Sequence, residues 1–148
     1  MKFSPIPQVL ADLKKGRLVI VVDDKDRENE GDLIVAAQPA PSSNVNFMAK
    51  YGRGIICVPM ESQRLSELGI DLMVANNTDE MKTAWTVSID AKRGVTTGIS
   101  AHDRARTIQA LIEPSTKSGD LSRPGHIFPL RAREGGVLVR AGHTEACV

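Results

Sequence analysis

Two short apolar runs enclose a segment crowded with carboxylates, and this arrangement constrains the fold more than any other feature. The runs cover residues 18–22 and 33–37. The ten residues between them carry six acids against two basic side chains, and these acids are Asp23, Asp24, Asp26, Glu28, Glu30 and Asp32. Short apolar runs bounded by polar segments are typical of buried strands. The pattern therefore predicts a pair of strands that hold an acidic loop in place.

The acidic loop is a candidate metal site. Crowded carboxylates raise one another's pKa unless a cation or hydrogen-bond donors hold them ionised. In an extended stretch, Glu28, Glu30 and Asp32 would point to one side, as ligands around one centre must, and Gly31 would allow a turn. A solvated loop is the alternative, since charged side chains are mostly exposed. A calcium EF-hand is excluded, because no register that starts on an early aspartate puts a glutamate at the closing position.

Composition narrows the class of protein. A chain of 148 residues with 41% hydrophobic content is expected to form one domain. The net charge of +1 and the aromatic content of 3% argue against a nucleic-acid partner. No stretch approaches the roughly 18 apolar residues of a membrane span, so we expect a cytoplasmic protein. Cys57 and Cys147 are too few for a disulfide framework, and Cys57 is interpreted as a buried small residue rather than a nucleophile.

Periodicity and turn residues predict interleaved helices and strands. Besides the strands that flank the acidic loop, we expect helices over 5–15, from Ser43, over 61–68 and over 100–112. We expect strands over 55–59, 84–90, 126–130 and 137–140, a loop over 115–125 and a turn around residues 134–136. The order lacks the regularity of a βαβ repeat, which favours an α+β fold, a mixed α/β sandwich around one sheet.

Two segments share the pattern Arg-x-Gly-His, namely residues 123–126 and 140–143. Each places a cation and an imidazole beside a glycine that permits close backbone approach, so both are candidates to line one pocket. A structural histidine is the alternative for either segment. The second segment continues with Thr144 and Glu145, and Arg140 supplies a fork suited to phosphate; its alternative is a frayed tail.

A third polar segment precedes the helix expected at residue 100. Thr96, Thr97 and Gly98 form a hydroxyl-rich turn ahead of Ser100, and the N-terminus of a helix favours phosphate. An ordinary capping box that includes Asp103 explains the same residues. His102 lies in the first turn of this helix and is expected to be exposed.

Four of these motifs together resemble the 3,4-dihydroxy-2-butanone 4-phosphate synthase family of riboflavin biosynthesis. The motifs are residues 23–32 (DDKDRENEGD), 96–100 (TTGIS), 123–130 (RPGHIFPL) and 141–146 (AGHTEA). Residues 76–78 and 83–86 are also similar to this family, with Trp85 where phenylalanine is more usual. His102 is another departure from the pattern.

The resemblance implies conversion of D-ribulose 5-phosphate to L-3,4-dihydroxy-2-butanone 4-phosphate and formate, with Mg²⁺ or Mn²⁺, in a homodimer whose pockets lie near the subunit interface. It implies Glu28 and His143 as metal ligands and His126, Glu28 and Asp32 as catalytic residues. It implies substrate contacts from Arg27, Asp32, Thr97, Arg140, Ala141, Gly142 and Thr144, where Arg27 and Asp32 hold the sugar and Arg140 with Thr144 holds the phosphate.

The resemblance also implies that family members continue past the His-Thr-Glu motif through a further helix and strand with a catalytic glutamate. Residues 1–148 are therefore interpreted as a synthase domain shortened at its C-terminus, either a truncated chain or the front of a bifunctional protein with a GTP cyclohydrolase II domain. The alternative function is an inactive fragment that binds metal and sugar phosphate or only dimerises.

Overall fold

The computed structural model describes residues 3–148, which form helices and strands in mixed order. The helices are α1 (Ile6–Lys14), α2 (Ser42–Phe47), α3 (Ser62–Glu67), α4 (Ala101–Ile112) and α5 (His143–Ala146). The strands are β1 (Val19–Val22), β2 (Gly31–Ile34), β3 (Cys57–Met60), β4 (Ile89–Ala91) and β5 (Leu121–Arg131). A π-helical turn follows α2 over Met48–Gly52, and 3₁₀ turns cover Ser118–Asp120 and Gly136–Leu138.

The strands form two sheets. β1 and β2 pair in antiparallel fashion, with Val19 opposite Ile34 and Val22 opposite Gly31, so the predicted pairing is confirmed. The second strand was expected over 33–37 but covers Gly31–Ile34, and no residue of either strand is buried, so the expectation of buried strands is wrong. The other sheet has the order β3-β5-β4, in which β5 runs parallel to β3 and antiparallel to β4. The α+β class is confirmed, although the described strands divide between two sheets where one was expected.

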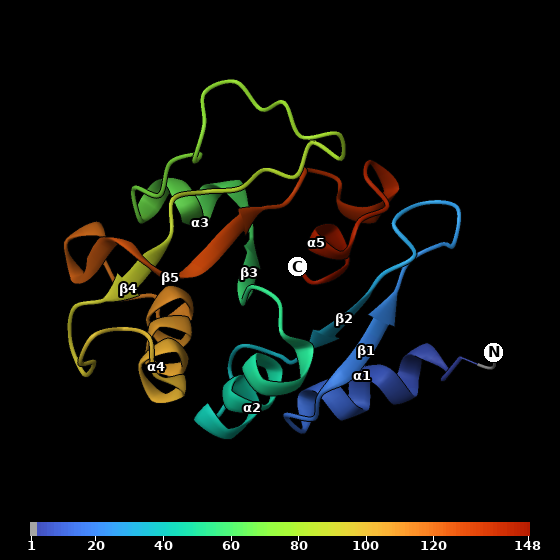
Figure 1. The fold of residues 1–148 in the computed structure, drawn as a ribbon, viewed down its shortest axis with the longest axis horizontal. Helices are drawn as coiled ribbons and strands as arrows, with labels where there is room; N and C mark the ends of the chain where they lie inside the picture. The colour runs from blue at the N-terminus through green and yellow to red at the C-terminus, as the bar shows by residue number, and fades with distance from the viewer. Residues whose placement is uncertain (1–2) are drawn as a thin grey trace.

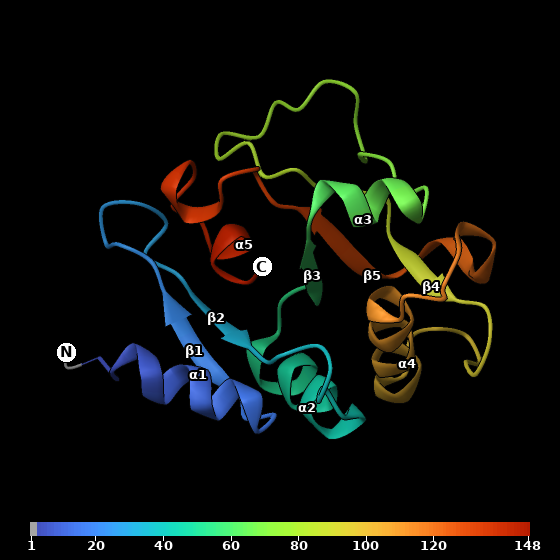
Figure 2. The same cartoon turned by 180° about the vertical axis from the view of Figure 1, so that it is seen from behind.

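The core lies between the three-stranded sheet and helices α2, α3 and α4. Its fully buried members include Val45 of α2, Leu68 after α3, Ile89 of β4, Leu111 of α4 and Ile127 of β5. The β1–β2 pair, α1 and α5 lie on one side of the molecule, and β4 with α4 lies on the other (Figures 1 and 2).

Three sequence predictions are wrong in the second half of the chain. Residues 121–125, expected in a loop, begin the long strand β5, and the strand expected over 84–90 is shifted to Ile89–Ala91. The proline and glycine at 124 and 125 indicated a loop, but they lie in an irregular part of β5 where the pairing register with β4 shifts.

The strand expected over 137–140 is also wrong. Gly135 and Gly136 both have positive φ angles, of 87° and 60°, and residues Gly136–Leu138 form a 3₁₀ turn. Two successive left-handed residues turn the chain away from an extended path. The apolar side chains of this turn are therefore exposed, and Leu138 is 95% exposed.

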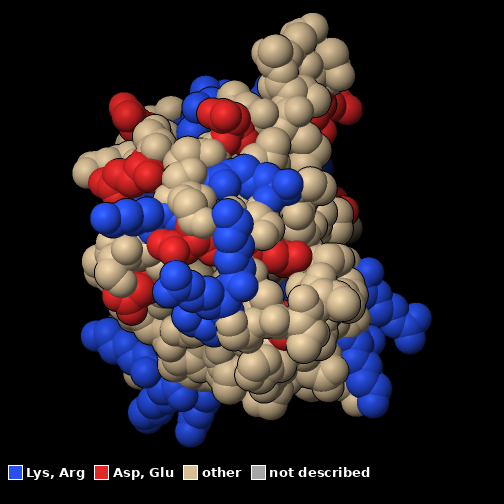
Figure 3. All heavy atoms as spheres, turned by 90° about the vertical axis from the view of Figure 1, so that its left-hand side faces the viewer, with Lys and Arg blue, Asp and Glu red and all other residues tan. Residues whose placement is uncertain are grey.

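Within residues 3–148, no helix is both long enough and apolar enough to cross a bilayer. On the face that carries β4 and α4, Lys and Arg side chains are interspersed with Asp and Glu (Figure 3). Both cysteines are free. Cys57 is half-buried rather than fully buried. Burial, and then the nearby Asp32 carboxylate, raise the pKa of its thiol to about 12, which agrees with the interpretation of Cys57 as an unreactive residue.

Candidate metal centre and active site

Asp23 organises the acidic loop from within. Its carboxylate accepts the backbone N–H groups of Glu28 at 3.0 Å and Glu30 at 2.9 Å, and the Arg27 guanidinium at 3.0 Å. Burial alone would raise the pKa of Asp23, but these donors outweigh it and lower the pKa to about 2. Asp23 is therefore an ionised anchor that fixes the loop before any ligand binds.

The loop does not alternate as the sequence suggested. Asn29 adopts a left-handed conformation with φ of 54°, whereas Gly31 is already the first residue of β2. The turn at Asn29 interrupts the extended geometry that would have aligned every second side chain. Glu28 and Asp32 consequently face His143, while the Glu30 side chain is not part of that group.

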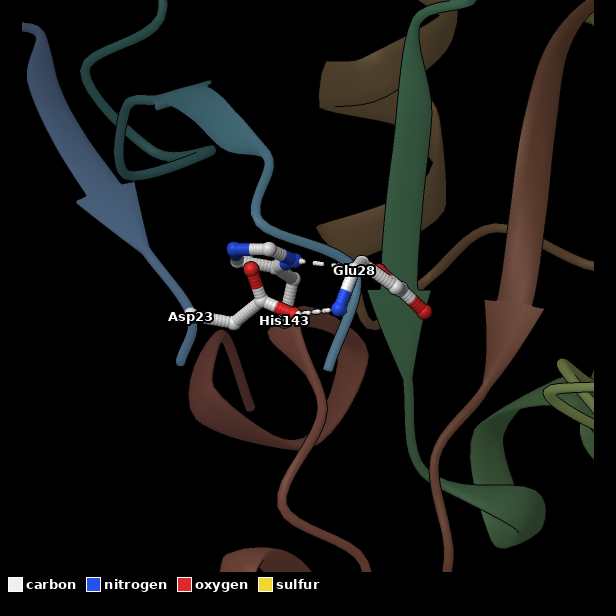
Figure 4. Close-up of side chains that lie close together, drawn as sticks. All are labelled: Asp23, Glu28 and His143. Carbon is white, nitrogen blue, oxygen red and sulfur yellow. Dashed lines mark hydrogen bonds and ion pairs between the residues drawn. The ribbon is translucent and has the colours of Figure 1, made fainter. Parts of the chain in front are cut away.

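Asp23, Glu28 and His143 converge on one point (Figure 4). One ligand atom from each lies within 4.8 Å of the others. His143 Nδ1 lies 3.8 Å from Glu28 Oε2 and 3.6 Å from Asp32 Oδ2. Two ligands on one Mg²⁺, each at about 2.1 Å, can be at most about 4.2 Å apart, so the two separations from His143 Nδ1 fit a shared hard cation.

The surroundings of His143 support the same interpretation. Its side chain is only 11% exposed, and its Nε2 atom is buried without a hydrogen-bond partner among the described residues. A ring nitrogen at 3.6–3.8 Å from two carboxylates is too distant for a hydrogen bond. The imidazole and the two carboxylates are thus close together but form no hydrogen bond with one another. Ligands that surround one metal ion have this arrangement.

A buried ion pair holds the segment that carries His143. Arg140 donates to Glu145 at 2.6 Å, to the Thr83 hydroxyl at 3.0 Å and to the Met81 carbonyl at 3.2 Å. Glu145, whose side chain is 1% exposed, also accepts the Arg133 N–H. The frayed-tail alternative is therefore wrong.

The remaining predicted substrate residues of this segment lie around the same ion pair. A side chain at Gly142 would overlap the Arg140 guanidinium and lie 2.9 Å from Glu145, so a larger residue there would have to displace this ion pair. Thr144 is buried and Ala141 is exposed. Several N–H groups of Arg140 already donate to protein groups. The sequence predicted Arg140 only as a phosphate ligand and did not predict this structural role.

His126 belongs to a different group of residues. Its Nδ1 atom lies 2.7 Å from Asp90 Oδ2, and its backbone N–H donates to Asp90 Oδ1 at 3.0 Å. The irregular pairing creates this arrangement, because Ile89 is opposite Ile127 whereas Asp90 is opposite Ser122. Irregular strand pairing commonly redirects a side chain next to an active site.

The turn at residues 96–98 covers the His126–Asp90 pair. Gly98 has φ of 92°, and a Cβ there would overlap the Asp90 carboxylate and lie 2.7 Å from His126 Nδ1. Thr97, the predicted substrate contact, is exposed beside it. His102, 76% exposed, is outside this group as expected.

The predicted site residues therefore form two groups in a single chain. One contains Arg27, Glu28, Asp32 and His143, and the other contains His126 and Thr97. Within residues 3–148, no hydrogen bond or ion pair joins them, and their parent elements lie on different sides of the molecule (Figures 1 and 2). Two hollows of about 580 and 400 Å³ open near α3 and the 72–84 loop, and none of these site residues lines either hollow.

A match to a family profile identifies the family of the chain. The profile of 3,4-dihydroxy-2-butanone 4-phosphate synthase matches residues 7–148. The chain belongs to this synthase family.

Curated relatives agree with the profile. Riboflavin biosynthesis protein RibBA of Synechocystis sp. is 64% identical over 148 residues, which cover 99% of this chain and 27% of that protein. The 3,4-dihydroxy-2-butanone 4-phosphate synthase of Neisseria meningitidis serogroup B is 55% identical, over 98% of this chain and 40% of that protein. The chain thus spans well under two thirds of the length of these synthase relatives.

A solved synthase has the same fold. The crystal structure of a 3,4-dihydroxy-2-butanone 4-phosphate synthase in complex with two magnesium ions superposes with a TM-score of 0.96 at 47% identity. The match covers 99% of this chain and 68% of that one.

Sequence reasoning on this synthase chain missed two buried acids, Asp90 and Asp103, and treated Asp23 only as one of the loop carboxylates. Asp90 lies in a strand whose three residues are all buried. Charged side chains are almost never buried without a partner, so an aspartate in a predicted buried strand could have indicated a functional residue. Asp103 was explained by helix capping alone. Its carboxylate also accepts hydrogen bonds from Thr96 and Gly98, and the sequence does not specify the conformation of that turn.

The two anchoring carboxylates predict how the stability of this synthase chain depends on pH. Hydrogen bonds from the Thr96 hydroxyl, and then the Gly98 N–H, lower the pKa of Asp103 to about 2, as for Asp23, against an ordinary 3.8. Because the folded state holds these protons less tightly, the unfolded state binds more of them in acid. We expect thermal stability to fall between about pH 4 and pH 2 and to change little from these groups above pH 5. Unfolding temperatures measured across that range for the wild type and Asp103→Asn test this; the variant should show the smaller change.

Proposed function

We propose that the protein converts D-ribulose 5-phosphate to L-3,4-dihydroxy-2-butanone 4-phosphate and formate. The observation that carries the proposal is the convergence of Glu28, Asp32 and His143 in a chain of this family. The comparisons give no support to the alternative of an inactive fragment. A single synthase domain over residues 1–148, a cytoplasmic location and the absence of a nucleic-acid partner stay predictions.

Glu28 and His143 would hold a divalent cation, Mg²⁺ or Mn²⁺, with Asp32 at its edge. Carboxylate oxygens are the ligands that Mg²⁺ prefers, and an imidazole also suits Mn²⁺. The magnesium complex of the solved synthase supports this assignment. When bound, such an ion polarises the substrate carbonyl and makes the neighbouring C–H more acidic.

His126 would take the C3 proton of the sugar. Its Nδ1 faces the Asp90 carboxylate at 2.7 Å, so the neutral ring is held with its proton on Nδ1 and its lone pair on Nε2. Removal of the C3 proton gives an enediol, which loses the C1 hydroxyl as water. A skeletal shift then joins C3 to C5, and addition of one water molecule releases C4 as formate. Glu28 and Asp32 would exchange protons with the sugar oxygens during these steps.

The substrate would be oriented by residues from both groups. Arg27 lies beside Glu28, with its guanidinium 3.1 Å from the Glu28 carboxylate, and would hold the sugar with Asp32. Arg140, Ala141, Gly142 and Thr144 would contact the phosphate, with Thr97 at the opposite side of the pocket. Because Glu145 already engages Arg140, the guanidinium is fixed in direction and offers its remaining donors.

A homodimer would bring the two groups together. In one chain, His126 and the cation ligands lie in separate places, and the loop over 72–74 and the turn over 137–139 expose contiguous apolar residues of the kind that interfaces cover. We propose that His126 of the partner subunit completes each pocket.

Formate release tests the proposed function. With ribulose 5-phosphate and Mg²⁺, we expect one formate for each sugar phosphate consumed, and removal of the ion by EDTA should abolish turnover until Mg²⁺ or Mn²⁺ is restored. Ribose 5-phosphate, which lacks the C2 ketone, is the control and should release none. Consumption of ribulose 5-phosphate without formate, or formate release that EDTA leaves unchanged, would refute the assignment.

A further inference from the structure

We propose that Asp103 is a positioning residue for His126, acting through the turn over residues 96–98. The proposal rests on the role of His126 in the proposed function, but its physical content is a statement about ring orientation that holds with or without substrate. Asp103 lies on α4 and has a side chain that is 3% exposed. Among residues 3–148, its hydrogen bonds lead to the turn and not to the His126 ring.

The Asp103 carboxylate holds the turn at two points. Its Oδ2 atom accepts the Thr96 hydroxyl at 2.7 Å and the Gly98 N–H at 3.0 Å. A hydrogen bond to an ionised group is roughly twice as strong as a neutral one. The turn is therefore attached to α4 by its first and last residues.

The attached turn lies directly against the His126–Asp90 pair. A methyl group on Gly98 would overlap Asp90 Oδ2, so the Gly98 backbone forms one wall of the pair. With φ of 92°, Gly98 is in a conformation that other residues rarely adopt. A turn released from Asp103 would be free to move away from the pair, and Asp90 would gain room to rotate and meet water.

Helix capping alone does not explain the direction of the Asp103 side chain. In a complete capping box, the carboxylate at the third helical position returns to the N–H of the N-cap residue. Here the Ser100 hydroxyl accepts the Asp103 N–H at 3.0 Å, but the Asp103 carboxylate points to Thr96 and Gly98 instead. Half of the capping box is present, and the other half has been replaced by the link to the turn.

The expected consequence is control of the His126 tautomer. The Asp90 side chain is in contact with the ring, Asp103 lies behind Gly98, and His102 is an exposed neighbour 3.6 Å from Asp103. While the turn holds Asp90 in place, the neutral ring keeps its proton on Nδ1. A mobile Asp90 would let the ring exchange tautomers and rotate, and the population with an available Nε2 lone pair would fall.

Nitrogen-15 NMR of the three histidines in the full protein tests the proposal. We expect the neutral His126 ring to be almost entirely the Nδ1–H tautomer in the wild type and a mixture in Asp103→Asn and in Thr96→Val. The second variant removes one donor while leaving Asp103 and its neighbour His102 unchanged. Both should lower kcat by about 10- to 100-fold with little change in KM, since small misplacements near the reacting atoms cost this much.

Ser100→Ala is the matched control, because it removes the other half of the capping box and should lower thermal stability without changing the His126 spectrum. An unchanged His126 tautomer in both Asp103→Asn and Thr96→Val would overturn the proposal, as would an equal change in Ser100→Ala. The spectra are recorded without substrate. The tautomer result therefore stands separately from the formate assay, and a failure of the proposed reaction can be told apart from a failure of this proposal.

Discussion

Replacing His126 by alanine is expected to lower kcat by about 10²–10⁴-fold, the range that removal of a general base commonly gives. The structure places the ring in a hydrogen bond with Asp90 at 2.7 Å and leaves it partly exposed on its other edge. Among the described residues the ring makes a hydrogen bond only with Asp90, so the loss should fall on turnover and leave KM close to the wild type. Steady-state formate release measured with saturating Mg²⁺ checks the result.

His102→Ala is the matched control for this experiment. It makes the same substitution on an exposed ring outside both groups and should leave kcat unchanged. An unaltered kcat in His126→Ala would remove His126 from the mechanism. A large rise in KM with kcat retained would instead assign it to substrate binding.

Replacing Glu28 by glutamine is expected to weaken the binding of Mg²⁺ or Mn²⁺ by more than about 100-fold. Loss of a residue that only supports a ligand already costs 10- to 100-fold in metal affinity, and Glu28 is itself a proposed ligand. The amide keeps the shape of the side chain but removes the negative charge next to His143 and Asp32. Calorimetric titration of each ion in the presence of ribulose 5-phosphate measures the affinity.

Glu30→Gln is the control for charge, because it makes the same change two residues away on an exposed side chain outside the cluster. Equal ion affinity in Glu28→Gln and the wild type would refute the metal assignment.

The His126→Ala and Glu28→Gln variants also test whether the pocket is shared between subunits. If each pocket combines the two groups across subunits, a mixture of His126→Ala and Glu28→Gln chains should recover activity that neither has alone, because some mixed dimers contain one intact pocket.

The first half of the fold was predictable from local signals. The apolar runs around the acidic loop and the periodicity of the first helix act through neighbouring residues, and the strand pair and α1 lie close to where they were expected. The same holds for α4 later in the chain, which begins at its Ser100 cap. The second half depends on pairing over long separations. The start of β5 was not predicted, because its proline and glycine lie where its register with β4 shifts. No local sequence pattern indicates that a strand about 30 residues earlier will pair with such a segment.

For the candidate site, residue types could be inferred but not their grouping. The crowding of carboxylates indicated only that the loop needs a compensating cation or donors. The resemblance to the synthase family implied that His143 meets the loop, and the structure brings His143 next to Glu28 and Asp32. Asp90 and Asp103 were missed because their importance comes from what the turn at Gly98 covers. The two Arg-x-Gly-His segments look alike in sequence but place their histidines in different groups, because one lies in a strand and the other begins a short helix.

The central position of β5 also bears on how the protein is made. Both of its neighbours, β3 and β4, precede it in the chain, and each pairs with β5 rather than with the other. During synthesis the sheet cannot assemble until residue 131 has left the ribosome. Two strands therefore wait without their partner while roughly 40 to 70 residues are added, a matter of seconds at typical elongation rates. Unpaired strand edges are templates for association between chains. Nascent chains of this protein should therefore depend on chaperones most strongly in the interval just before β5 emerges.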